Sequence, residues 1–118
     1  MEPLAVHHVS INVADAAASS EFYVDVLGLI RRTDRPDIGI GGAWLDAGGQ
    51  QVHLVEGAVP VGNGEHFALL VGDLAGAIHE LRGRGIKVGD PSPIGTSLQS
   101  FLHDPDGNLI ELHQAAAR

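Results

Sequence analysis

An eight-residue stretch that occurs twice constrains the fold of this chain more than any other feature of its sequence. The copies are residues 8–15 (HVSINVAD) and residues 66–73 (HFALLVGD), and each begins with a histidine and ends with an aspartate. Each of these histidines has a companion at one fixed spacing, since 53 − 8 and 111 − 66 both equal 45, which gives His53 and Glu111. A duplicated supersecondary unit would produce this pattern.

The two copies predict the same order of elements, a strand, a helix and three more strands. In residues 6–13, apolar residues alternate with polar ones, as in a strand with one buried face, and a strand at 66–72 would place Phe67, Leu69 and Val71 on one face. In the first unit the expected strands are 6–13, 29–34, 42–46 and 50–56, with a helix at 16–27. In the second unit they are 66–72, 86–89, 97–103 and 108–114, with a helix after Asp73.

Helix and turn signals support this assignment. Asp15 and Asp73 are suitable N-caps, and Gly28 suits the left-handed position that follows a helix. In the first helix the expected buried face is Ala18, Phe22 and Val26, and in the second it is Leu74, Ala77, Ile78 and Leu81. Gly48-Gly49 predicts a hairpin turn, and Asp104-Pro105-Asp106-Gly107 predicts a β-turn.

We therefore expect an α+β fold in which two tandem βαβββ modules form a curled mixed sheet. The whole chain, 1–118, would be one domain, with module one at about 4–56, a linker at about 57–64 and module two at about 65–114.

The charge and composition exclude several classes of function. Fifteen acidic and seven basic residues give a net charge of −8, which disfavours nucleic acid and anionic membranes as partners. The absence of cysteine excludes disulfides and thiolate metal sites. No apolar run has the length of a membrane span, and residues 1–4 do not begin a signal peptide, so we expect a cytoplasmic protein.

The two histidines and their companions are the candidate metal ligands. His8, His53, His66 and Glu111 each lie opposite the apolar side chains of their strands, so all four would face the inside of a curled sheet. Three imidazoles and a carboxylate suit Zn, Ni, Co, Mn or Fe(II). Glu111 and His53 are also the candidate catalytic residues. If His53 stays off the metal, it would act as a nearby base, and the other three residues would match the facial triad of Fe(II) oxygenases.

Other polar and aromatic residues are weaker candidates. By strand parity the substrate pocket would include Ser10, Asn12, Trp44, Gln51, Gln99 and Phe101. Trp44 and Phe101 could equally be core or interface residues. Arg31, Arg32 and Arg35 form either a solvated hairpin or an anchor for a substrate carboxylate. We interpret the remaining histidines as non-ligands; they are His7, His79, His103 and His113.

Two motifs resemble the vicinal oxygen chelate superfamily. They are residues 21–29 (EFYVDVLGL) and residues 104–112 (DPDGNLIEL), together with the pattern His8, His66 and Glu111. The superfamily includes glyoxalase I, fosfomycin-resistance transferases, extradiol dioxygenases, methylmalonyl-CoA epimerase and bleomycin-resistance proteins. The resemblance covers about residues 4–114 and implies paired βαβββ modules with a divalent metal that chelates vicinal oxygens of a small substrate.

The chain departs from the known branches at specific positions. Glutathione-dependent glyoxalase I has an arginine where this chain has Asn12, a glutamate ligand where it has His53, and an asparagine where it has Gly57. Fosfomycin transferases have a tyrosine where this chain has Phe101, and residues 88–118 contain no lysine. We therefore expect glyoxalase-like lyase or isomerase chemistry, or ring-cleaving dioxygenase chemistry, but not glutathione-dependent glyoxalase I. The alternative is a protein that binds a small molecule without turnover, as in the bleomycin-resistance branch.

The resemblance and the open sheet edges both favour a homodimer. The metal ligands could come from both subunits or from one chain, because the linker at 57–64 is long enough for either arrangement.

Overall fold

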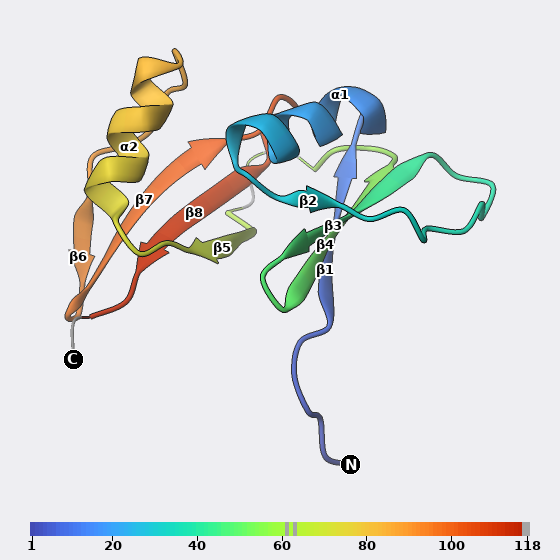
Figure 1. Ribbon diagram of the computed structural model, residues 1–118, viewed down its shortest axis with the longest axis horizontal. Coiled ribbons are helices and arrows are strands. Elements are labelled where there is room, and N and C mark those ends of the chain that lie inside the picture. Colours follow the sequence, from blue (N-terminus) through green and yellow to red (C-terminus); the bar gives the residue numbers. More distant parts are fainter. Residues whose placement is uncertain (61, 63, 117–118) are drawn as a thin grey trace. The chain divides into compact units, whose positions relative to one another are not determined.

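The chain folds into two compact units, each of which contains one copy of the repeat (Figure 1). The computed structural model describes residues 1–60, 62 and 64–116. Unit 1 is Met1–Pro60 and unit 2 is Val61–Arg118. Two positions of the predicted linker, 61 and 63, lie outside the described residues.

Both units have the predicted order of elements. Unit 1 contains β1 (His8–Val13), α1 (Ala16–Glu21), the π-helical turn η1 (Phe22–Val26), β2 (Ile30–Arg31), β3 (Gly42–Ala47) and β4 (Gln50–Glu56). Unit 2 contains β5 (His66–Leu70), α2 (Leu74–Gly83), β6 (Ser92–Ile94), β7 (Ser97–His103) and β8 (Leu109–Gln114). The predicted α+β fold of paired βαβββ modules is confirmed.

Each unit forms its own mixed four-stranded sheet, and the two sheets have equivalent strand orders. The orders are β1-β4-β3-β2 and β5-β8-β7-β6. The first and last strands of each unit pair in parallel, and the remaining pairs are antiparallel. A parallel pair requires a crossover connection, and the helix of each unit lies within that connection.

The pairing register reproduces the repeat seen in the sequence. In unit 1, Ser10 lies opposite His53, and in unit 2, Ala68 lies opposite Glu111. The first strand of each unit therefore has its histidine two residues before the partner of the companion residue. The two residue pairs that have equal spacing in the sequence therefore occupy equivalent positions in the two sheets.

The last strand of each unit holds the start of that unit's helix. Asp15 accepts hydrogen bonds from the backbone nitrogens of Ala17 and Ala18, and Glu56 Oε2 of β4 accepts one from Ala16 N (3.0 Å). In unit 2, Asp73 accepts from the nitrogen of Gly76, and Gln114 Oε1 of β8 accepts from the nitrogen of Leu74 (2.8 Å). Both predicted N-caps are confirmed.

The predicted buried face of the first helix is wrong. Ala18 is exposed, while Ala16, Ser19, Ser20 and Tyr23 are buried. The cause is that the core is filled by the fully buried ring of Tyr23, and the two small serines let the helix approach the sheet. The predicted face of the second helix agrees better, since Leu74, Ile78 and Leu81 are buried.

Two predicted strands differ from the structure. The segment expected at 29–34 is a strand only at Ile30–Arg31. The segment expected at 86–89 makes a single bridge, from Val88 to Leu102, and the carbonyl of Val88 accepts a hydrogen bond from the side chain of Arg82. The edge strand is β6, where Pro93 is tolerated since an edge position can lack an N–H donor.

Among the residues that the structure describes, neither helix combines the length and the apolar character needed to cross a bilayer.

Candidate functional site

The first strands of both units direct their histidines away from the core, as predicted. Exposure alternates along β1 and β5, and His8 and His66 are on the exposed side. Their companions are different, because His53 and Glu111 are polar side chains that are each only 8% exposed. A buried polar group needs partners, so the contacts of these two residues define the site.

In unit 2 the predicted ligands are in direct contact. His66 Nε2 lies 3.2 Å from Glu111 Oε1, and His66 Nδ1 lies 2.9 Å from the carbonyl oxygen of Gly64. A carbonyl only accepts hydrogen bonds, so Nδ1 carries a proton. The hydrogen bond to Gly64, and then that to Glu111, raise the pKa of His66 above its ordinary value.

The two facing atoms of this pair fit a bound cation. In the neutral ring Nε2 presents a lone pair, and it faces a carboxylate oxygen that is also an acceptor. Such a pair is favourable only when a proton or a metal ion lies between the two atoms. A metal-binding histidine is also commonly fixed by a hydrogen bond from its other nitrogen, which is the place that the Gly64 carbonyl occupies here.

The second oxygen of Glu111 has its own partner. His113 Nδ1 lies 2.8 Å from Glu111 Oε2, so the carboxylate is held between two imidazoles. From the sequence, His113 was interpreted as a non-ligand. The available signal was strand parity, because residues 111 and 113 project from the same face of β8.

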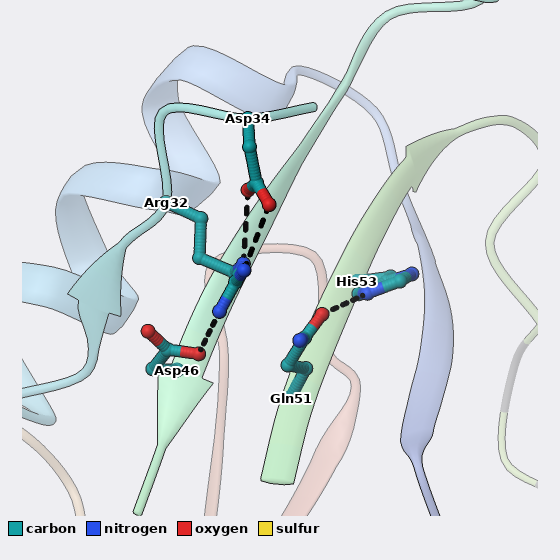
Figure 2. A network of polar contacts seen from close by, with 5 residues as sticks. All are labelled: Arg32, Asp34, Asp46, Gln51 and His53. Carbon is teal, nitrogen blue, oxygen red and sulfur yellow. Dashed lines mark hydrogen bonds and ion pairs between the residues drawn. The ribbon is translucent and has the colours of Figure 1, made fainter. Parts of the chain in front are cut away.

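In unit 1 the two predicted ligands meet through their ring faces. The imidazoles of His8 and His53 are stacked with their ring centroids 3.9 Å apart, and the ring of Trp44 also stacks on His53, with a centroid distance of 4.6 Å. His53 Nε2 lies 2.8 Å from Gln51 Oε1 (Figure 2). The amide oxygen accepts, so Nε2 donates and the lone pair of the neutral ring lies on Nδ1.

Burial, and then the charge of His8, lower the pKa of His53 below its ordinary value. Stacked imidazoles present their in-plane lone pairs side by side, whereas an ion bound by both rings needs lone pairs that converge. Across residues 1–60, 62 and 64–116, no three His, Cys, Asp or Glu side chains gather closely enough to hold a metal ion.

Three of the six predicted pocket residues contact a predicted metal ligand. Trp44 and Gln51 contact His53, and the ring of Phe101 meets that of His66 edge-on at 5.4 Å. Ser10 is exposed on β1, and Gln99 is half-buried on β7 opposite His113. Asn12 donates a hydrogen bond to the carbonyl of Ala58 (2.9 Å).

Of the three arginines, Arg32 is paired with acidic groups (Figure 2). Its guanidinium contacts Asp34 (2.7 Å) and Asp46 (2.9 Å), and the hydrogen bond from Arg32 lowers the pKa of Asp34. Arg35 donates to the carbonyl of Ile40. The charges of Arg32 and Arg35 both contribute to the lowered pKa of His53, so these two arginines lie within electrostatic reach of that ring.

Curated relatives overturn one expectation from the sequence. A probable lactoylglutathione lyase of Synechocystis sp. is 34% identical, over 94% of this chain and 95% of the relative. A lactoylglutathione lyase of Arabidopsis thaliana is 31% identical over 91% of this chain, which spans only 43% of that longer relative. Relatives that share this much sequence carry the name of glutathione-dependent glyoxalase I, so the prediction that excluded that activity is wrong.

Two of the residues by which this chain departs from glutathione-dependent glyoxalase I, Asn12 and Gly57, lie close together. A Cβ atom built at Gly57 would lie 3.5 Å from the side chain of Asn12, so two of the three departing positions are neighbours in space, while the third is His53. The corner formed by Asn12 and Gly57 contains none of the four predicted ligands. The third departure, a histidine in place of a glutamate ligand at position 53, exchanges one metal-binding side chain for another.

The fold and the whole-chain sequence pattern agree with these relatives. A glyoxalase family protein from Bacillus anthracis superposes with a TM-score of 0.86, covering 97% of both chains at 22% identity, which supports the fold alone. The profile of the Glyoxalase/Bleomycin resistance protein/Dioxygenase superfamily matches residues 5–112. The chain therefore belongs to the Glyoxalase/Bleomycin resistance protein/Dioxygenase superfamily.

Proposed function

We propose that this protein is a divalent-metal-dependent lyase that acts on lactoylglutathione. The observation that carries the proposal is the similarity to lactoylglutathione lyases over nearly the whole chain. It is supported by the His66–Glu111 pair, whose facing nitrogen and oxygen are suited to hold a cation.

The proposed ligands are His66 and Glu111 of unit 2 together with His8 and His53 of unit 1. The stacked rings of His8 and His53 would have to rotate apart for their lone pairs to converge on one ion. Nitrogen and oxygen donors without thiolate suit Zn, Ni, Co, Mn or Fe(II). When bound, the ion would supply Lewis-acid polarisation of a substrate carbonyl oxygen. Burial lowers the pKa of His53, which favours the neutral ring whose lone pair can bind an ion.

The chemistry of a lactoyl thioester defines what the protein residues must do. Removal of the glutathione thiol leaves a three-carbon 2-oxoaldehyde, so the hydroxyl-bearing carbon loses a proton and the thioester carbon gains one. One group that takes the proton and returns it to the neighbouring carbon would balance the reaction. We assign this role to Glu111 or His53, because both are buried and can accept a proton.

Glutathione carries two carboxylates, which need cationic partners in a protein of net charge −8. Arg32 is already paired with Asp34 and Asp46, which leaves Arg31 and Arg35 as the proposed anchors in this cluster. Ser10, Asn12, Trp44, Gln51, Gln99 and Phe101 remain the proposed pocket residues.

We also propose that the protein is a homodimer with metal ligands drawn from both subunits. Mixing His8→Ala with Glu111→Ala under conditions of subunit exchange tests this arrangement. A shared site would regain part of its metal binding in the mixed dimer, whereas a site within one chain would regain none. A monomeric mass at micromolar concentration would contradict the dimer.

Thiol specificity tests the proposed reaction. The protein, loaded with each metal in turn, is incubated with methylglyoxal and glutathione, and the lactoyl thioester is measured. The matched controls replace glutathione by 2-mercaptoethanol, which lacks both carboxylates, and the parent by Glu111→Gln. We expect product with glutathione and parent protein only. Tight binding of small molecules without any turnover would instead indicate a binding protein.

A further inference from the structure

The contact between His113 and Glu111 has no counterpart in the ligand set proposed above. His113 Nδ1 lies 2.8 Å from Glu111 Oε2, and Glu111 Oε1 is the oxygen that faces His66. A carboxylate only accepts hydrogen bonds, so His113 donates from Nδ1. The two oxygens of one carboxylate are thereby given different partners.

His113 is well placed to hold this contact, because its backbone is fixed. The strand β8 runs to Gln114, and the carbonyl of His113 accepts a hydrogen bond from the nitrogen of Val71 (2.9 Å). In the sheet, His113 lies between Leu70 of β5 and Gln99 of β7. Its imidazole therefore projects from a paired strand and from the same face as Glu111.

The burial of Glu111 makes the second hydrogen bond important. The carboxylate is in a residue that is 8% exposed, and a buried acceptor without a partner costs about 1–3 kcal/mol of stability. With Oε2 held by His113, rotation about the last side-chain bond would break a hydrogen bond. Only Oε1 is then free to approach the Nε2 atom of His66.

Unit 1 provides an internal comparison. The residue two positions after His53 on β4 is Val55, which has no hydrogen-bonding group in its side chain. His53 instead contacts Gln51, two positions before it. A hydrogen-bond donor at this position is thus found in unit 2, where the companion is a carboxylate, and not in unit 1, where it is an imidazole.

We propose that His113 is a positioning residue that holds Glu111 Oε2, so that Glu111 presents Oε1 alone to a divalent ion. This inference rests on the proposed metal-dependent function. Partners of this kind orient a ligand, and their removal typically weakens metal affinity by ~10–100-fold.

Two substitutions at this position separate orientation from simple packing. His113→Val removes the donor and introduces the residue type that unit 1 has at its equivalent position, and valine is well suited to a strand. His113→Asn keeps a nitrogen donor at the same number of bonds from the backbone as Nδ1. The control is His103→Asn, an exposed histidine at the end of β7.

The measurement is metal affinity of the full chain by calorimetry, with zinc and nickel ions as the probes. We expect His113→Val to bind ~10–100-fold more weakly than the parent, and His113→Asn and His103→Asn to bind close to parent affinity. A parent that binds metal and a folded His113→Val that binds equally well would overturn this inference alone. Equal loss in His113→Val and His113→Asn would overturn it too, because packing would then explain both. A parent that binds neither ion would overturn the proposed function and this inference together.

Discussion

The two units have the same strand order and the same register, but they place different chemistry at the equivalent position. In unit 1 the companion of the first-strand histidine is His53, and the two rings stack face to face. In unit 2 the companion is Glu111, and its carboxylate meets the edge of His66. The shared strand order and register give the two companion residues equivalent backbone positions. The residue type then determines whether the contact is a ring stack or a pair of facing donor atoms.

The residues around His53 in unit 1 and around Glu111 in unit 2 also differ. In unit 1, burial lowers the pKa of His53 and thereby favours its neutral form. Unit 2 surrounds a carboxylate with two imidazoles and raises the pKa of His66. The duplicated fold therefore offers one neutral nitrogen site and one charged site, and both types are useful to an enzyme that binds a cation and moves a proton.

Removing the charged companion should give the largest effect. We expect Glu111→Gln to lower kcat/KM for lactoylglutathione formation by ~10²–10⁴-fold, because it removes both a ligand and a candidate proton carrier. Steady-state kinetics on the metal-loaded protein measure this loss. Glu80→Gln, on the exposed side of α2, is the matched control. A Glu111→Gln protein with parent activity would show that unit 2 does not supply the reacting group.

A change of residue type in unit 1 should make the two units more alike. We expect His53→Ala to weaken metal affinity by at least ~10–100-fold, and His53→Glu to regain most of it, since a carboxylate then occupies the place that Glu111 has in unit 2. Calorimetric titration compares the three proteins. Equal affinity of His53→Ala and the parent would show that His53 is not a ligand.

The helix caps extend the comparison to stability. Asp15 accepts two backbone hydrogen bonds and Asp73 accepts one, so Asp15→Ala should cost more free energy of unfolding. We expect a loss toward about 2 kcal/mol for Asp15→Ala and nearer 0.5 kcal/mol for Asp73→Ala. Urea unfolding of both variants measures the difference. The reverse order would indicate that Glu56 alone is enough to hold the start of α1.

The smallest expected effect is a difference in titration between the two units in the metal-free protein. His66 should titrate above the ordinary histidine pKa of about 6.5 and His53 below it. The stabilising contribution of His66 is complete below about pH 6.5 and is lost as the pH rises through its folded pKa. His53 acts in the opposite direction, because the unfolded ring takes up its proton first as the pH falls.

Histidine NMR signals followed against pH, assigned with His53→Ala and His66→Ala, measure both values. If the two rings titrated together, the proposed contrast between a neutral and a charged site would fail.

Strand periodicity was enough to predict much of the fold. The alternation around His8 and His66 predicted which face each occupies, and the aspartates before each helix predicted where the helices begin. Periodicity failed at Ser19 and Ser20, because the buried side of a helix can be lined by small hydroxyl residues when a large ring fills the core. It also failed at Val88, which forms a single bridge and whose carbonyl accepts a hydrogen bond from the side chain of Arg82.

The site was predicted less completely than the fold. The spacing of 45 residues identified the pairs, but it contains no information on whether two rings stack or meet at their edges. Strand parity places residues 111 and 113 on the same face of β8, but it does not determine whether their side chains form a hydrogen bond. The glutathione-dependent activity was excluded wrongly from three single positions, Asn12, His53 and Gly57, of which Asn12 and Gly57 are neighbours in space.

The central claim is that a divalent ion enables this chain to act on lactoylglutathione, and a metal titration of activity tests it most directly. Metal-stripped protein is supplied with increasing zinc or nickel, and thioester formation from methylglyoxal and glutathione is measured at each step. We predict no turnover without metal and a rise to a plateau at about one ion per chain, because a single ion with open positions serves such a site. Turnover that is independent of added metal, or a fully loaded protein that forms no thioester, would contradict the account.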